Sequence, residues 1–512
     1  MGGSGAIQCR LAPPHATYLF KHALMQDAAY GTLLREPRRA LHGRVAETLE
    51  SQFAEIAERQ PELLARHCTE AGLIDKAAAL WGNAGQRSLA RSALEEGTIQ
   101  LNRTLAQIAA LPSTAVLRRD QIKFQCALAS ALMHTKGYAA PETKASLDQA
   151  RLYIERAETL GEPPPEDPLL LSVLYGFWVV NYVAFNGHAT RELAVQFLAL
   201  AEKQRRKVPL MSGHGIMGAS LLLTGDIAGG QAHCDQAIAL YNRAEHRPLA
   251  TRFGQDVGVA TLSYRSFALW LLGFPEAART DIEHALKKAR EIGQAATLMH
   301  TLAHAPWTHF WIGTYNVADT LIEEVIALAS EKGALMWKAC GMMHRGTLLA
   351  LTGKAANAIP MITSAMKAMR STGSTLWIPS FLSYLARAYA ELGRLNDAWR
   401  CISEAMTAVE TSKERWCEAE VNRIAAEIAL KSPEPETAKA EAYFERALSV
   451  ARAQQAKSWE LRAAISLARL WRSQGKPQQA RDLLAPVYGW FTEGFDTRDL
   501  KEAKALLEQL AS

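Results

Sequence analysis

Glycines recur every forty residues through much of this chain. The four clearest stand in the turns LLGFPEA, WIGTYNVA, LTGKAANA and ELGRLNDA, at Gly273, Gly313, Gly353 and Gly393. Weaker copies occur at Gly187, Gly225 and Gly475, and a Pro-rich loop near Ser432 replaces one glycine. A fixed period of this length indicates a repeat architecture, in which each unit buries its apolar face against the next. The 512 residues are therefore predicted to form a repeat array, because they are too many for one ordinary core.

Each unit has the pattern of a helical hairpin. A stretch with helical apolar spacing precedes the glycine, as in PSFLSYLARAYAEL, and a second amphipathic stretch follows it, as in NDAWRCISEAMTAVE. Glycine can end the first helix in the left-handed conformation. An Asp or Asn just after the glycine is expected to accept a hydrogen bond from the next helix. Runs typical of strands are nearly absent, so the sequence predicts an all-α chain.

The best unit reads LSYLARAYAELGRLNDAWRCISEAM. Its diagnostic residues are Leu382, Leu385, Ala386, Tyr389, Gly393, Ala398, Ile402 and Ala405. The same frame places small residues at the position where the second helix packs closely, namely Ala278, Ala318, Ala358 and Ala480. These units resemble tetratricopeptide repeats with longer helices than usual. The resemblance implies a right-handed superhelical solenoid of helical hairpins.

Two end motifs carry a wider resemblance. The segment FKHALMQDAAYGTLLREPRRALHGRVAETLE resembles the helical, winged-helix-like end of the ATPase module in bacterial proteins that join a class III adenylate cyclase, an AAA/STAND-type ATPase and a helical repeat array. LLAPVYGWFTEGFDTRDLKEAKALL is similar to the end of that array. The resemblance implies a remnant of the ATPase module at 1–55, a helical connector with degenerate repeats at 56–116, the repeat array at 117–495 and a capping helix at 496–512.

The motifs for catalysis are missing from these 512 residues. There is no phosphate loop G-x-x-x-x-G-K-[ST], no G-x-S-x-G elbow and no H-x-E…C-x-x-C. We expect no catalytic residues and no cofactor. The chain is predicted to be a non-catalytic sensor or scaffold for signal transduction, associated with an ATPase or adenylate cyclase. The alternative is the tail of a class III adenylate cyclase/ATPase whose catalytic domains lie outside this sequence.

Charge and cysteine content indicate which classes of partner and which compartment to expect. A net charge of +5 is small for this length and does not predict a nucleic-acid binder. The basic cluster REPRRALHGR could contact nucleic-acid phosphates, but acidic residues at positions 36, 47 and 50 lie close by. A nucleic-acid partner is therefore disfavoured. Seven cysteines lie far apart without a C-x-x-C pair, which suits a reducing cytoplasm.

One uncharged segment, residues 168–185, is long enough to be considered as a membrane span. Asn181 lies inside it, Pro168 opens it, and no Lys/Arg cluster flanks it. A helix buried in the protein explains the segment equally well and is the favoured interpretation. No membrane partner is expected.

Candidate binding residues follow from the concave face of tetratricopeptide arrays, which the first helices of the hairpins form. Carried onto this chain, that pattern selects an aromatic group and a charged group: Phe267, Trp270, His300, Trp307, Phe310 and Trp311, then Arg387, Glu391, Arg469 and Arg472. Aromatic and arginine anchors dominate protein interfaces, so a protein or peptide partner is predicted, with a small ligand as a further candidate. The alternative is that the aromatics fill the core, with Trp307 and Trp311 as exceptions. His300 and His304 have a spacing that can hold zinc, but Thr301 replaces the glutamate of a zincin, and no metal is expected.

Overall fold

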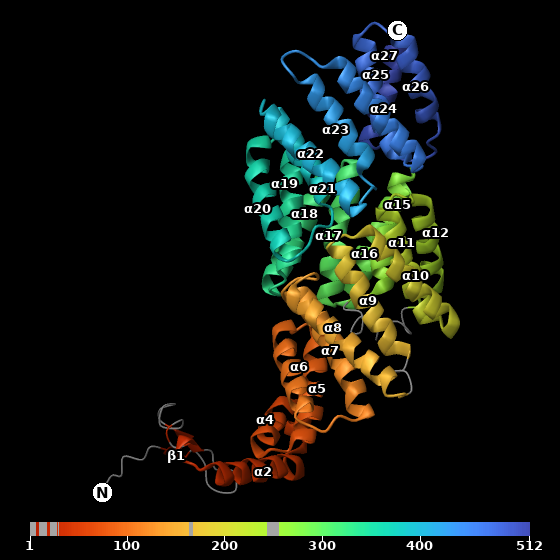
Figure 1. Ribbon diagram of the computed structural model, residues 1–512. Coiled ribbons are helices and arrows are strands. Elements are labelled where there is room, and N and C mark those ends of the chain that lie inside the picture. The colour runs from red at the N-terminus through yellow and green to blue at the C-terminus, as the bar shows by residue number, and fades with distance from the viewer. Residues whose placement is uncertain are drawn as a thin grey trace. The chain divides into compact units, whose positions relative to one another are not determined.

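The computed structural model describes residues 7–9, 18–20, 28, 30–162, 167–242 and 255–511. This part of the chain is almost entirely helical (Figure 1). Its two strands are β1 (Ile7–Cys9) and β2 (Tyr18–Phe20), which pair antiparallel. The sequence does not predict these strands, because three residues are too few to show the alternation of a strand. Residues 21–27 of the ATPase-like motif lie outside the described residues.

The chain divides into two compact units, the first comprising residues 1–87 and 99–117. Its helices are α2 (Arg35–Gln52), α3 (Ala54–Arg59), α4 (Pro61–Ala71) and the larger parts of α5 (Ile74–Ala90) and α6 (Leu94–Ala109). Its core is small, with Ala46 of α2, Cys68 of α4 and Trp81 of α5 among the buried residues. In the basic cluster, Arg38 lies over the ring of Tyr30 and Arg39 pairs with Glu36.

The second unit comprises residues 88–98 and 118–512. The first residues of α7 belong to the first unit and the rest of α7 to the second. The helices of the second unit are, in chain order, α7 (Ala115–Thr135), α8 (Pro141–Thr159), α9 (Asp167–Val183), α10 (Gly187–Gln204), α11 (Lys207–Leu223), α12 (Ile227–Leu240), α15 (Val257–Leu271), α16 (Pro275–Ile292), α17 (Ala295–Ile312), α18 (Tyr315–Glu331), α19 (Leu335–Leu351), α20 (Ala355–Ser371), α21 (Ile378–Glu391), α22 (Leu395–Ser412), α23 (Glu418–Leu430), α24 (Thr437–Ala453), α25 (Lys457–Ser473), α26 (Pro477–Gly489) and α27 (Arg498–Ala511). From α9 to α26 consecutive helices pair into hairpins. The predicted solenoid of tetratricopeptide-like hairpins is confirmed.

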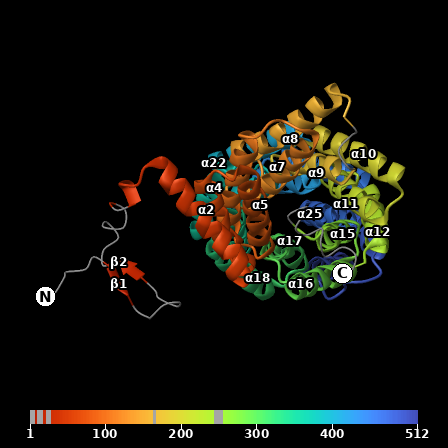
Figure 2. The ribbon, with the colours of Figure 1, turned by 90° about the horizontal axis from the view of Figure 1, so that it is seen from below.

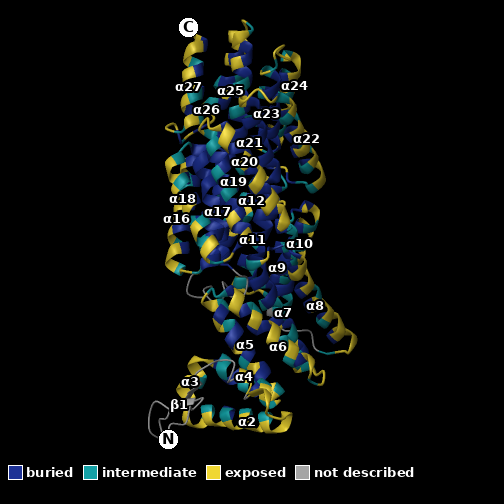
Figure 3. Cartoon of the chain, turned by 90° about the vertical axis from the view of Figure 1, so that its left-hand side faces the viewer, coloured by how far each residue is buried: buried dark blue, intermediate teal, exposed yellow. Residues whose placement is uncertain are grey.

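The two helices of a hairpin have different surroundings. First helices such as α15, α17 and α25 lie inside the second unit, and second helices such as α12, α16 and α18 lie on its outside (Figure 2). In α17 every residue except Leu298 is buried, whereas α16 and α18 turn exposed residues outward (Figure 3). The small residues of the repeat frame are fully buried, as predicted: Ala278, Ala318, Ala358, Ala398 and Ala480.

The turns follow the prediction at their glycines. Gly273, Gly313, Gly353 and Gly393 have φ angles of +96°, +89°, +75° and +72°, the left-handed region that ends a helix. Gly187 was wrongly included, because it is the first residue of α10 and lies behind the N-cap Asn186.

The expected Asp/Asn caps are wrong at these four turns. The capping positions are occupied by Phe274, Thr314, Lys354 and Arg394, whose side chains make no cap hydrogen bond. The Asn residues of the last three turns lie two or three positions beyond the N-cap, already inside the helix, where their side chains are not at the capping position.

Segments five hairpins apart in the sequence lie against each other. The carbonyl of Val183, at the end of α9, accepts the N–H groups of Thr375 and Leu376 before α21, both at 3.0 Å. The carbonyl of Leu223, at the end of α11, accepts the N–H of Arg415 before α23 at 2.8 Å. Ser458 in α25 donates to the carbonyl of Trp270 in α15. One superhelical turn therefore closes after about five hairpins, and the starts of first helices in the next turn lie on the ends of first helices in the turn before it.

Among the described residues, no helix combines the length and apolar character needed to cross a membrane. The segment considered for that role forms most of α9. Its Trp178 stacks on Tyr182 at a ring distance of 4.7 Å and donates from Nε1 to Ser220 Oγ at 2.9 Å. The interpretation of α9 as a helix that packs within the protein fits these contacts.

Candidate functional site

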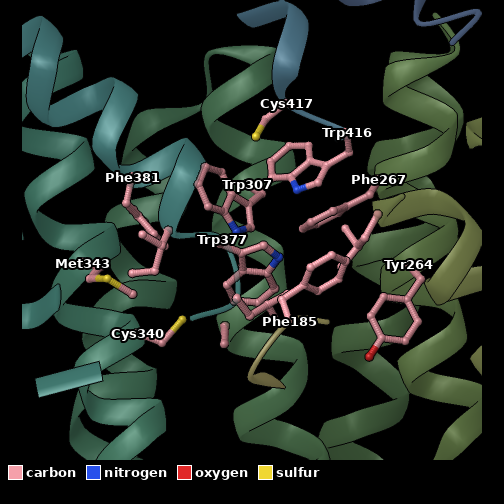
Figure 4. Packing of buried hydrophobic residues seen from close by; sticks show 14 of the residues in the cluster. Phe185, Tyr264, Phe267, Trp307, Cys340, Met343, Trp377, Phe381, Trp416 and Cys417 are labelled. Carbon is pink, nitrogen blue, oxygen red and sulfur yellow. The ribbon is translucent and has the colours of Figure 1, made fainter. Parts of the chain in front are cut away.

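The predicted aromatic group lies in the core. The exposed fractions are 1% for Phe267, 2% for Trp270, 3% for His300, 0% for Trp307, 3% for Phe310 and 1% for Trp311. Trp270 stacks on Trp311 with ring centroids 4.6 Å apart, and Trp307 contacts Phe381 at 5.0 Å. Figure 4 shows Trp307 surrounded by Trp377, Phe381 and Trp416. The prediction that these aromatics line an accessible groove is wrong for all of them except Phe310, and so is the exception made for Trp307 and Trp311. Trp307 is covered by α21 and the segment before α23, and Trp270 is covered by Trp459 of α25.

Each of the three histidines of α17 has its own hydrogen-bond partner. His300 Nε2 lies 3.2 Å from the Tyr264 hydroxyl, His304 Nδ1 donates to the carbonyl of His300 at 2.7 Å, and His309 Nδ1 lies 2.8 Å from Thr314 Oγ1. Burial lowers the pKa of His304 and of His309 to about 4. These imidazoles are therefore neutral at pH 7. Within the described ranges no three His, Cys, Asp or Glu side chains converge as metal ligands do.

The predicted charged group lies at a cleft near the C-terminus. This cavity of about 460 Å³ is lined mainly by α21, α23, α25 and α27. Three of the predicted charged residues, Arg387, Glu391 and Arg469, line it, and Phe310 of α17 contributes to its wall. Its remaining charged lining residues are Glu420, Arg423, Glu427, Lys431, Arg462, Arg498, Asp499 and Glu502.

A buried ion pair organises the wall formed by α23. Arg423 donates from Nε and Nη2 to the two carboxylate oxygens of Glu420, at 2.7 and 2.8 Å, and from Nη1 to Glu427. Glu420 is 5% exposed and Arg423 is 8% exposed. Burial by itself would raise the pKa of Glu420, but the charge of Arg423 and its hydrogen bonds lower it below the ordinary value. The pair is thus ionised and held in one geometry.

The opposite wall is held by α27. Arg462 of α25 donates from Nε to Asp499 at 2.6 Å and from Nη2 to the carbonyl of Trp311 at 3.2 Å. Arg498 donates to Glu502 at 2.9 Å and to the Tyr315 hydroxyl at 3.0 Å. These contacts fix the capping helix against α25 and against the first residue of α18. The walls are therefore preorganised by charged hydrogen bonds.

Two further cavities continue the cleft. One of about 400 Å³ shares Glu427, Leu430, Ser466 and Arg469 with it. Another of about 480 Å³ shares Arg498 and Glu502 with it and extends to Gly313. We call the three adjoining cavities, which share these lining residues, the charged groove. Each has the size of an ordinary ligand pocket, and together they can take an elongated ligand.

Arg472 is the predicted charged residue that the structure places elsewhere. It donates to Gln509 of α27 and lines none of the three cavities. Most of the charged lining residues were not predicted from the sequence. A signal was present, because Glu427 follows Arg387 by forty residues and so occupies the same place in the repeat. A charged residue at an inner position of successive first helices marks a face that the core does not use.

No protein-family model matches this sequence. An uncharacterized protein of Rhizobium meliloti (strain 1021) is 22% identical over 459 residues, which cover 90% of this chain and 44% of that protein. The chain thus spans less than half the length of this relative. The crystal structure of a Rap protein complexed with Competence and Sporulation Factor aligns with a TM-score of 0.54 and 12% identity, over 74% of this chain and 99% of that one. Yeast Tom70 aligns over 92% of this chain and 97% of that one at 12% identity, but with a TM-score of 0.35. At such identities the likeness to the Rap protein concerns the fold.

Proposed function

We propose that this chain is a non-catalytic helical-repeat scaffold that binds a peptide or an extended protein segment in the charged groove and acts in signal transduction. The observation that carries the proposal is the groove itself, since it is the place where inner-face residues of α21, α23 and α25 remain accessible. The six cysteines with described side chains are free, which supports a cytoplasmic location.

The composition of the groove suits a polypeptide. Apolar side chains such as Ile424, Ile428 and Leu430 line it between charged donors and acceptors. A peptide offers the complement, because its side chains can occupy apolar subsites while its backbone and polar groups hydrogen-bond to the walls. The Rap protein with the same fold was crystallised with Competence and Sporulation Factor, which supports ligand binding by a solenoid of this kind.

A second candidate is that the chain forms the ligand-binding part of a larger ATPase or adenylate cyclase. Two observations favour it: the resemblance of the N-terminal motif to an ATPase module, and the Rhizobium relative, of which the matched residues cover 44%. Binding in the groove would then control an activity that resides in other domains. The groove has the same role in both candidates.

Selection of peptides from a phage-displayed library of random twelve-residue sequences tests the proposal. Leu430→Trp adds bulk where two cavities of the groove meet, and Leu335→Trp is the matched control at a site 55% exposed and outside the groove. We expect enriched peptides to bind the wild-type chain and the control equally, and the plugged variant about tenfold more weakly or worse. Failure to enrich any peptide, or equal binding to the plugged variant, would refute the proposal.

A further inference from the structure

We infer that the charged groove selects extended segments in which Asp or Glu side chains alternate with apolar ones. This specificity rests on the proposed function and adds the chemistry of the partner to it. Three features of the groove carry it: carboxylates that are already paired, cations with donors to spare, and apolar side chains that line the same cavity.

The carboxylates of the central cavity are all engaged by arginines. Glu391 accepts from Arg387 at 3.2 Å, Glu420 and Glu427 accept from Arg423, Asp499 accepts from Arg462, and Glu502 accepts from Arg498. A basic ligand would have to compete with these intramolecular partners for each carboxylate. Positively charged segments are therefore disfavoured.

Three cations that line the same cavity have N–H donors without a partner in the described part of the chain. Lys431 is exposed at the end of α23, and its ammonium group has no ion pair or hydrogen bond with any described residue. Arg387 donates only from Nε, to Glu391, and Arg469 donates only from Nη2, to Glu502 at 3.3 Å. A guanidinium has five N–H donors, so about four remain on each arginine. Three helices thus present unused positive donors to one cavity.

The same cavity also has an apolar lining. Leu351, Ile424, Ile428, Leu430 and Ile465 line the cavity together with the cations. In an extended segment successive side chains point to opposite sides. A segment that alternates acidic and apolar residues can therefore direct one set to Lys431, Arg387 and Arg469 and the other to the apolar lining.

A nucleic acid fits less well. Its phosphates carry one negative charge at every nucleotide, whereas the walls alternate in sign and include the buried Glu420. Regularly spaced phosphates would face carboxylates as often as arginines. A polypeptide can place its few carboxylates only where cations are free, and this is why we favour a peptide.

Fluorescence anisotropy of the full chain with three pools of labelled ten-residue peptides tests the inference. The pools alternate Leu, Phe or Val with Asp/Glu, with Asn/Gln or with Lys/Arg, and all carry C-terminal amides so that only side-chain carboxylates are probed. We expect the acidic pool to bind about tenfold tighter than the neutral one and to weaken with added salt. Lys431→Glu should weaken the acidic pool about tenfold, and Lys367→Glu, on the exposed side of α20, should leave it unchanged.

The outcomes separate the two proposals. Equal or tighter binding of the neutral or basic pool, lost in Leu430→Trp, would overturn the acidic specificity and leave the peptide groove standing. The same conclusion follows if no pool binds but phage-selected peptides do. Displacement of the acidic pool by a 20-nucleotide thymidine oligomer, which Lys431→Glu abolishes, would overturn the preference for a peptide. If none of the three pools binds and no phage-selected peptide binds, both proposals are overturned.

Discussion

Trp307 is a residue whose environment predicts a large effect of mutation. It has no exposed surface, and its ring packs against Trp311, Phe381 and Trp416. Trp307→Ala leaves a cavity that these large neighbours cannot fill, so we expect the free energy of unfolding to fall by about 3–5 kcal/mol. Urea denaturation followed by circular dichroism measures it. The control Phe495→Ala, at a site 48% exposed, should cost less than about 1 kcal/mol, and equal losses for both would contradict the core placement.

Glu414 is a buried acid outside the groove. It has no exposed surface and lies between α22 and α23. Its carboxyl oxygens lie 3.0 and 3.1 Å from the backbone nitrogen of Trp377, which donates to them, and Trp416 Nε1 donates at 2.9 Å. Burial raises the pKa of Glu414 to about 8, although both hydrogen bonds act in the opposite direction. At neutral pH the carboxyl is therefore mostly protonated.

This pKa predicts that Glu414 makes the fold less stable as the pH rises. The unfolded chain releases the proton near pH 4.5, whereas the folded chain retains it to about pH 8. The contribution of Glu414 is thus complete below about pH 4.5 and is lost toward pH 8, by at most about 1.4 kcal/mol per pH unit. Glu414→Gln removes this dependence. Urea denaturation from pH 5 to 8.5 should show wild type losing stability relative to the variant, and parallel profiles would contradict the assignment.

Buried histidines affect that comparison in the other direction. Burial lowers the pKa of His304 to about 4 and of His344 to about 3. Their contribution is present above about pH 6.5, where the unfolded chain is also neutral, and is lost as the pH falls. Because both histidines are present in wild type and in Glu414→Gln, the difference between the two profiles isolates the glutamate.

Helices and turns show what the sequence could predict. The forty-residue glycine register and the alanines of the second helices depend on contacts between neighbours in the chain, and the structure has both. Burial of Trp270 and Trp311 depends on α25, which lies five hairpins away from α15 in the sequence. No local sequence pattern indicates how tightly the superhelix winds. An aromatic on an inner face therefore looks the same in the sequence whether the next turn covers it or leaves it open.

Part of the charged groove could be predicted from the repeat pattern. The concave-face pattern of the first helices predicted Arg387, Glu391, Arg469 and Arg472, and the cleft is lined by the first three of them. The role of α27 was not predictable, because Arg498 and Glu502 follow ordinary spacing for an exposed helix. Only the folded chain brings them to Tyr315 and Arg469.

At the start of α16 a carboxylate from a distant segment caps the helix. Glu493 accepts the N–H groups of Glu276 and Ala277 at 2.8 and 3.0 Å, and the Glu276 carboxylate accepts the N–H of Gly494 at 2.9 Å. Glu493→Ala leaves two N–H groups without this acceptor, so we expect a loss of about 1–2 kcal/mol. Hydrogen–deuterium exchange in the first turn of α16 should become faster. Unchanged exchange, as expected for the exposed Glu434→Ala control, would contradict the capping role.

For the whole chain, the missing phosphate loop leads to a direct prediction. We expect the purified protein neither to bind nor to hydrolyse ATP, because nothing in its sequence resembles the backbone cradle that holds nucleotide phosphates. Isothermal titration calorimetry with Mg-ATP measures binding, and phosphate release measures turnover. Binding in the micromolar range would contradict the proposal of a non-catalytic scaffold.

Closure of the superhelix changes how the second unit should unfold. In an array with contacts only between neighbouring repeats, terminal repeats open first and independently. Here α25 and the segment before α27 are bound to α15 and α16 through Ser458 and Glu493. Opening of the C-terminal hairpins must therefore expose Trp270 and the start of α16, which lie near the middle of the array. The two regions should behave as one cooperative unit.

Pulsed hydrogen–deuterium exchange at increasing urea concentration tests this coupling. In the wild-type chain we expect peptides from α15–α16 and from α25–α27 to lose protection at the same urea concentration. The double variant Ser458→Ala/Glu493→Ala removes the bond to the Trp270 carbonyl and both bonds from the α16 N–H groups to Glu493, and it leaves the bond from Gly494 to Glu276. With the coupling weakened in this way, α25–α27 should open at lower urea while α15–α16 remains protected. A double variant in which Ser330 and Glu434, both exposed, are replaced by alanine is the control. Separate transitions in the wild-type chain would show that the turns of the superhelix touch without being energetically coupled.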